Sequence, residues 1–268
     1  MDNFTIFIYF MAYSLIGWAL ETVYCSLLEG KFVYRGFLNG PICPIYGFGA
    51  LLVLAVLGDF SSHPLILYGL GLVLATSLEY IASYLLERFF NMKWWDYSKK
   101  RFNIKGRVCL WNSTLFGLLA LVLIYWVHPR MVALLDQVSQ AYLRPLATGL
   151  FLLFGLDTIV TVAELLNLKP DLAGLESRIR ELEADLESSY SDLVARAEKR
   201  QLEKEIYKGY LAQEREFIRQ GLEAKIEDRI RDIRLGFSTR RIVKSYPNLR
   251  SELNPRSIRK IKEYIRRK

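Results

Sequence analysis

The sequence predicts an all-α membrane protein: a polytopic bundle of about five transmembrane helices with a C-terminal, cytoplasmic, coiled-coil-like helical tail. Three observations predict this class. Apolar stretches close to the length that crosses a bilayer recur through residues 1–167. Charge divides the chain sharply, because residues 1–167 hold 11 Lys/Arg and 10 Asp/Glu whereas residues 168–268 hold 25 and 18. The loops between the apolar stretches alternate between neutral and basic.

The apolar stretches are the candidate spans, since a spanning helix needs about 20 mostly apolar residues. They cover 4–27, 44–58, 64–86, 108–127 and 145–167. The second stretch is short and starts beside Pro41 and Pro44, so a re-entrant or half-helix is an alternative to full crossing. Irregular backbone at membrane depth persists only where protein or a water-filled cavity surrounds it. The first stretch lacks a basic flank and a small-residue cleavage site, which favours a retained helix over a signal peptide.

Loop charges predict the topology. The 59–63 loop carries no Lys or Arg and the 128–144 segment carries two, whereas the 28–43 loop carries two and the 87–107 loop carries seven. Basic loops stay in the cytoplasm, so the N-terminus is expected outside and the C-terminus inside. The alternation requires the second stretch to cross, which favours five spans over four. Segment 128–144 is expected to lie along the outer interface as an amphipathic turn or helix.

The charged tail is predicted to be helical. Pro170 separates it from the last span, and the predicted domains are 1–167 (transmembrane), 168–235 (charged, coiled-coil-like) and 236–268 (basic). Apolar residues step by four and three through Leu175, Ile179, Leu182, Leu186 and Leu193. A second run follows, with Leu202, Ile206, Tyr210, Phe217, Leu222, Ile226, Ile230 and Ile233. The heptad pattern is short, so pairing within one chain and homo-oligomerisation both remain open.

The C-terminal end is strongly basic. Residues 234–268 hold 12 basic and two acidic residues, and a short helix is predicted over 256–267. Beside a membrane anchor, such a segment suits anionic inner-leaflet lipids better than nucleic acid. The predicted partners are therefore the lipid bilayer and its anionic lipids.

Polar residues gather at the predicted cytoplasmic half of the bilayer. Ionisable groups there cost about 2.5 kcal/mol or more, so they tend to be paired and functional. The candidate substrate-binding residues are Glu21, Arg35, Glu79, Trp94, Trp95, Asp96, Asn103, Arg107, Asn112 and Asp157. Arg35 and Arg107 are the candidate partners of the acids. The alternative for acids near helix ends, such as Glu87 and Glu164, is that they reach the headgroups.

Two loops admit two interpretations each. The 34–47 loop contains three glycines and two prolines, which impose special backbone geometry. Arg35 and exposed N–H groups could receive an anion there, or the loop is a tight turn packed beneath the helices. Trp94 and Trp95 suit an interfacial aromatic belt, or they belong to a binding site with Asp96, which a belt does not explain.

Catalytic motifs are absent from the sequence. There is no GxxxxGK[ST], HExxH or GxSxG motif, and Cys25, Cys43 and Cys109 lack zinc spacing, which favours reduced thiols. His63 and His128, the two histidines, fall on the predicted outer side, so nucleophilic catalysis has no base. We expect no catalytic residue, metal or cofactor, and a non-enzymatic role is favoured without being decided.

A string of residues carries a family resemblance. It comprises Gly17-Trp18, Glu21, Tyr24, Arg35-Gly36-Phe37, Gly40-Pro41, Pro44 to Gly47, Glu79, Glu87, Trp94 to Ser98, Asn103 and Gly106-Arg107. Over roughly residues 5–130 the chain resembles the ABC-transporter type IV (CmpB-like) family of bacterial membrane proteins.

The resemblance implies a permease subunit that binds or passes a solute at a cytoplasmic-side polar pocket and works with a separate ATPase. The chain lacks the EAA-type loop by which many permeases couple to their ATPase, and the resemblance carries over no catalytic residue. Two alternatives stay open: a membrane-embedded enzyme or binder acting on an anionic or lipid-linked substrate, and a membrane scaffold with a coiled-coil tail.

Overall fold

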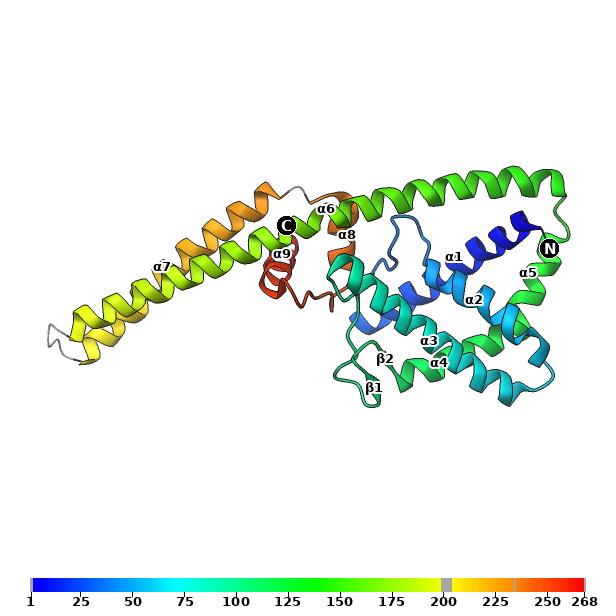
Figure 1. The fold of residues 1–268 in the computed structure, drawn as a ribbon, viewed down its shortest axis with the longest axis horizontal. Helices are drawn as coiled ribbons and strands as arrows, with labels where there is room; N and C mark the ends of the chain where they lie inside the picture. The colour runs from blue at the N-terminus through cyan, green and yellow to red at the C-terminus, as the bar shows by residue number, and fades with distance from the viewer. Residues whose placement is uncertain (1, 199–203, 234, 268) are drawn as a thin grey trace. The chain divides into compact units, whose positions relative to one another are not determined.

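The computed structural model describes residues 2–198, 204–233 and 235–267. Its helices are α1 (Asn3–Glu29), α2 (Pro44–Leu57), α3 (Pro64–Phe90), α4 (Leu110–Val122), α5 (His128–Leu135), α6 (Gln140–Glu198), α7 (Lys204–Asp232), α8 (Phe237–Ser245) and α9 (Pro255–Arg267) (Figure 1). Short turns η1 (Gly58–Phe60) and η2 (Leu123–Val127) extend α2 and α4. Among the described residues, the strands are β1 (Asn103–Ile104) and β2 (Val108–Cys109), an antiparallel pair. The all-α class is confirmed.

The chain forms two compact units. One comprises Met1–Leu166 with Phe237–Arg250, and the other comprises Asn167–Gly236 with Ser251–Lys268. The predicted basic segment 236–268 is therefore divided between the units, since α8 belongs to the first and α9 to the second. The limits predicted for three domains remain a prediction.

In the part of the chain that the structure describes, four helical stretches have the length and apolar character of membrane spans. They are α1, α3, Leu110–Leu135 and the apolar part of α6. The 14 residues of α2 extend about 21 Å, short of a hydrocarbon core of roughly 30 Å. The polytopic membrane class is thus confirmed, while full crossing by the second stretch stays a prediction beside its re-entrant alternative.

Two boundaries differ from those expected. The fourth stretch continues through the five-residue π-helix η2 into α5, and Pro129 is accommodated in the first turn of α5. The first half of segment 128–144 is therefore helical, which is one of the two forms predicted for it. In addition, α6 runs unbroken through Pro170, which is exposed. A proline removes one backbone hydrogen bond, here to the carbonyl of Leu166, and the long helix tolerates that loss.

Small residues let the helices of the first unit approach closely. α1 contacts α2, α2 contacts α3, and α3 contacts α4 (Figure 1). A Cβ at Gly47 of α2 would lie 2.2 Å from Ser14 Oγ of α1, and a Cβ at Gly17 would lie 2.2 Å from the ring of Tyr46. Membrane helices pack in this way because small residues bring their backbones together. The crossing of α1 and α2 sets the position of the loop between them.

Apolar residues of three helices form the core of the second unit. On α6 the buried positions are Leu168, Leu172, Leu175, Ile179 and Leu182, on α7 they are Ile226 and Ile230, and on α9 they are Ile258, Ile261 and Ile265. The spacing on α6 is the predicted heptad. Phe217, expected on the apolar stripe of α7, is 73% exposed. The side chains of Leu193, Leu202, Ile206 and Tyr210 lie outside those that the structure describes.

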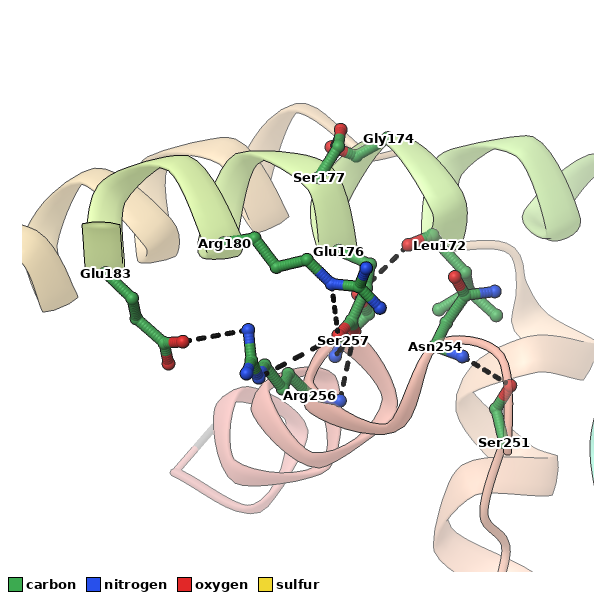
Figure 2. Close-up of polar contacts among 10 residues, drawn as sticks. All are labelled: Leu172, Gly174, Glu176, Ser177, Arg180, Glu183, Ser251, Asn254, Arg256 and Ser257. Carbon is green, nitrogen blue, oxygen red and sulfur yellow. Dashed lines mark hydrogen bonds and ion pairs between the residues drawn. The ribbon is translucent and has the colours of Figure 1, made fainter. Parts of the chain in front are cut away.

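Glu176 of α6 caps the N-terminus of α9 (Figure 2). The bounds of α9 match the helix predicted over 256–267. Glu176 Oε2 accepts hydrogen bonds from the backbone N–H groups of Arg256 at 3.0 Å and Ser257 at 2.9 Å. Arg256 also pairs with Glu183 at 2.9 Å. A carboxylate at a helix N-terminus satisfies otherwise unpaired N–H groups and the positive end of the helix dipole.

Candidate functional site

Arg35 lies in the first loop, residues 30–43, which joins α1 to α2. Its Nε and Nη2 donate to Glu21 Oε1 at 2.9 and 2.7 Å, and its Nη1 donates to the carbonyl of Ser245 at 2.6 Å. Its guanidinium also lies 4.1 Å from the ring centroid of Tyr246. Burial disfavours the charge, but Glu21, Tyr246 and Cys25 together outweigh burial, so the pKa of Arg35 is raised. Arg35 is thus paired with an acid, as the sequence predicts.

The carboxylate of Asp157 on α6 accepts hydrogen bonds from backbone N–H groups of the same loop. Its Oδ1 accepts from the backbone N–H of Asn39 at 3.0 Å and from Asn39 Nδ2 at 2.9 Å, and its Oδ2 accepts from Gly40 N–H at 2.7 Å. Thr161, one turn further along α6, donates to Asp157 Oδ1 at 3.2 Å. The sequence allows this loop to be either an anion site or a tight turn, and in the structure a carboxylate of the same chain accepts from its N–H groups.

Helix α8 supplies contacts to the first loop that sequence reasoning missed. Arg241 Nη1 and Nη2 donate to the carbonyls of Gly36 at 2.7 Å and Phe37 at 2.6 Å. Glu164 of α6, expected to reach the headgroups, accepts from the N–H of Thr239 at 3.2 Å and so caps α8. Gly236 followed by Ser238 and Thr239 is a helix-start signal that could have revealed α8.

Glu79 of α3 is the most deeply buried of the candidate acids. It is 6% exposed, and its Oε1 accepts from the hydroxyl of Tyr97 at 3.3 Å. Its Oε2 is buried and has no hydrogen-bond partner in the described part of the chain. Burial raises the pKa of the Tyr97 hydroxyl, and the carboxylates of Glu79 and Glu21 raise it further. A hydroxyl that keeps its proton remains a hydrogen-bond donor to Glu79.

Arg107 ends the loop that carries the β-hairpin. Its Nη2 lies 2.7 Å from Glu87 Oε2, and its guanidinium faces the rings of Tyr80 and Tyr84 of α3 at 5.6 and 5.4 Å. Its Nε and Nη1 are buried without a hydrogen-bond partner among the described residues. Arg107 therefore carries unused donors beside Tyr80, the residue that follows Glu79.

The two tryptophans of this loop have different surroundings. Trp94 is 3% exposed and packs against Phe37 at 5.9 Å and Phe90 at 5.4 Å between ring centroids. Trp95 is half-buried, and its Nε1 donates to the carbonyl of Arg107 at 2.8 Å. Trp94 thus joins the hairpin loop to the first loop.

Asp96 and Asn103 shape the hairpin loop. Asp96 accepts from the N–H of Ser98 at 3.0 Å and pairs with Arg250, beyond α8, at 2.8 Å. Asn103 Oδ1 accepts from the N–H of Gly106 at 3.0 Å. Gly106 has φ +67°, and a Cβ there would lie 2.7 Å from Asp96 Oδ1, so glycine is required. Both polar side chains are engaged within the protein.

The structure brings the candidate residues into two neighbouring groups. Glu21, Arg35 and Asp157 surround the first loop, whereas Trp94, Trp95, Asp96, Asn103 and Arg107 form the hairpin loop, with Glu79 bonded to its Tyr97. Asn112, in the first turn of α4, is half-buried and contacts neither group within the described residues. The described residues contain no group of three or more His, Cys, Asp or Glu that could hold a metal ion.

Comparison with known proteins adds one match. A family model described as "Putative ABC-transporter type IV" matches residues 8–162. No curated protein and no solved structure shows a significant match. The matched residues include every candidate site residue, whereas Arg241 and the rest of α8 lie outside them.

Proposed function

Because the chain belongs to the ABC-transporter type IV family, we propose that it is a permease-type transport component that binds or passes a polar solute at Glu79, Tyr97 and Arg107. The chain is a membrane component by its family and its apolar helices. The proposal extends that statement to a solute and to the residues that meet it. It places the site at the cytoplasmic side of a multi-pass cell-membrane protein with its N-terminus outside.

The observation that carries the proposal is the set of buried polar atoms without partners. A buried acceptor or donor left unpaired costs about 1–3 kcal/mol, and more when the group is charged. Glu79 Oε2 offers an acceptor, and Arg107 Nε and Nη1 offer donors, all within the family-matched part of the chain. A solute with both donors and acceptors would satisfy these atoms. An apolar solute would not.

Energy for transport would come from a separate ATPase subunit. The sequence has no phosphate-binding GxxxxGK[ST] loop of its own. The charged second unit offers a surface outside the apolar helices on which such a subunit could dock. We also propose anionic inner-leaflet lipids as partners of the basic segment 234–268. Its side chains Lys244, Arg259 and Arg266 are exposed and could meet such lipids.

Isolation from native membranes tests the transport proposal. The tagged full-length chain would be purified in mild detergent, with and without a non-hydrolysable ATP analogue. We expect an ATPase subunit to co-purify and its retention to depend on the nucleotide. A lone homo-oligomer with no nucleotide-dependent partner would contradict the proposal.

The alternative of a membrane-embedded enzyme or binder of anionic or lipid-linked substrates has Glu79, Asp96, Arg35 and Arg107 as its working residues. Arg35 gives its donors to Glu21 and Ser245, so it supports that alternative less than Arg107 does. The scaffold alternative depended on the tail, whose buried stripe on α6 is flanked by polar contacts to α9 of the same chain. Glu79 and Arg107 support a polar binding site under either of the first two functions, and the family membership favours transport.

A further inference from the structure

The first loop wraps three oxygen atoms around the guanidinium of Arg241. The carbonyls of Gly36 and Phe37 accept from Nη1 and Nη2 at 2.7 and 2.6 Å, and Asn39 Oδ1 accepts from Nε at 3.3 Å. The ring of Tyr34 lies 5.7 Å from the guanidinium carbon. We name these three oxygens and this ring the cradle.

Contacts that do not involve Arg241 hold the cradle in shape. Gly36 has φ +108°, which turns its carbonyl in a way that other residues rarely allow. Asn39 is fixed by the Asp157 carboxylate at its backbone and at its side chain, and its carbonyl accepts from the Tyr34 hydroxyl at 2.9 Å. The acceptors should therefore stay oriented when Arg241 leaves, and a preorganised site binds more tightly.

The geometry of the cradle suits a guanidinium group. Arginine presents planar, forked donors and stacks on aromatic rings, whereas an ammonium is a compact point charge. The carbonyls of Gly36 and Phe37 accept hydrogen bonds from the two Nη atoms of the guanidinium. The ring of Tyr34 adds cation–π attraction. The Asp157 carboxylate, which accepts hydrogen bonds from Asn39, adds negative charge near the cation. It accepts no hydrogen bond from the cation itself.

Arg241 is held less firmly than Arg35. Burial lowers the pKa of Arg241, and the nearby Tyr246, Tyr34 and Asp157 offset only part of that effect. Within the described residues, no carboxylate oxygen lies within ion-pair distance of Arg241, whereas Arg35 has Glu21 at 2.7 Å. A desolvated cation that meets only neutral acceptors is stabilised less than one paired with a carboxylate. Another cation should therefore displace Arg241 more readily than Arg35.

We propose that the cradle is a binding site for guanidinium-bearing cations, filled in this structure by Arg241 of the chain's own tail and open to another such cation when α8 moves away. The occupant would be a small guanidinium solute or an arginine side chain presented by a protein. The proposal does not rest on transport, since the cradle would bind its ligand in a membrane protein of any function.

Chemical rescue tests the proposal. Full-length Arg241→Ala protein in detergent is expected to melt at a lower temperature than the wild type. Methylguanidinium, well below denaturing concentrations, should restore most of that loss, and tetramethylammonium at equal ionic strength should not. Adding Asn39→Ala to Arg241→Ala should abolish the rescue. Lys244→Ala, an exposed change on the same helix, is the matched control and should melt like the wild type, and methylguanidinium should raise the melting temperature of neither.

A synthetic peptide of residues 236–246 distinguishes the two possible occupants, a small guanidinium solute and an arginine side chain of a protein. Rescue by methylguanidinium alone or by both ligands supports the proposal, and rescue by both indicates that a protein arginine can also bind. Rescue by the peptide alone would overturn it, because the loop would then recognise α8 rather than a guanidinium. Equal effects of methylguanidinium and tetramethylammonium would overturn it as well.

A further variant and a further readout guard against misfolding. Arg241→Gln keeps the aliphatic part of the side chain and a polar end, and it replaces Arg241→Ala if that variant does not accumulate. In wild-type protein, methylguanidinium should compete with Arg241 and speed tryptic cleavage after Lys244 relative to tetramethylammonium. Unchanged cleavage together with failed rescue in Arg241→Gln would contradict the proposal.

Discussion

The carboxylate of Asp157 accepts two hydrogen bonds from Asn39, one from the backbone at 3.0 Å and one from the side-chain amide at 2.9 Å. A residue within an apolar helix thereby fixes a loop more than 100 positions earlier in the chain. Hydrogen bonds to a charged group contribute about 1.5–3 kcal/mol each. We expect Asp157→Ala to lower the melting temperature strongly and Asp157→Asn, which keeps one acceptor, to lower it less. Asp59→Asn, an exposed acid on η1, is the control and should have no effect.

Arg35 and Glu21 form a largely buried ion pair, with side-chain exposures of 11% and 19%. Removing one partner from such a pair costs about 3–5 kcal/mol, because the other charge is left buried. We expect Arg35→Ala to reduce the folded protein in membranes, measured by fluorescence-detected size exclusion. The double variant Glu21→Gln with Arg35→Ala should recover part of the loss. A double variant as poor as the sum of the single variants would show that the two residues act independently.

Glu176 holds the first turn of α9 through two backbone N–H groups. Losing a helix cap costs about 0.5–2 kcal/mol. Glu176→Ala should therefore speed hydrogen–deuterium exchange in α9 and leave exchange in α3 unchanged. Glu181→Ala, which removes an exposed pair with Arg178 on the same helix, should leave α9 as protected as in the wild type. Equal exchange in the two variants would refute the cap.

Lys262 of α9 predicts a pH dependence. Burial, with a smaller contribution from Arg266, lowers its pKa from 10.5 to about 8. The folded chain then binds this proton more weakly than the unfolded chain, so raising the pH favours folding. We expect this contribution to stability to be absent below about pH 8 and to grow between about pH 8 and pH 10.5. Lys262→Met should flatten that part of the melting-temperature profile, whereas exposed Arg259→Gln should not.

Sequence reasoning succeeded where the determinant is local or periodic. Long apolar stretches predict spans, and the heptad from Leu175 to Leu182 predicts a buried stripe, because each depends on spacing along one helix. Asp157 and Glu79 were singled out for the same reason, as charges within apolar helices.

Contacts between distant segments could not be predicted in the same way. Arg241 is one basic residue among 12 in its segment, and nothing local indicates that it meets the carbonyls of Gly36 and Phe37. Asp157 is among the predicted site residues, but two of its partners are the backbone N–H groups of Asn39 and Gly40, and every residue type except proline provides such a group. The continuity of α6 through Pro170 likewise departs from the local preference of proline, which favours a helix end.

ATP hydrolysis by the complex isolated from native membranes tests the central claim most directly, with wild-type and Glu79→Gln chains compared at equal membrane abundance. Glutamine keeps an acceptor for the Tyr97 hydroxyl, so the fold should survive while the carboxyl group at Glu79 is lost. We predict that both forms co-purify an ATPase and that its hydrolysis rate changes several-fold in Glu79→Gln. Absence of an ATPase from both preparations, or identical hydrolysis rates, would contradict a transport role centred on Glu79.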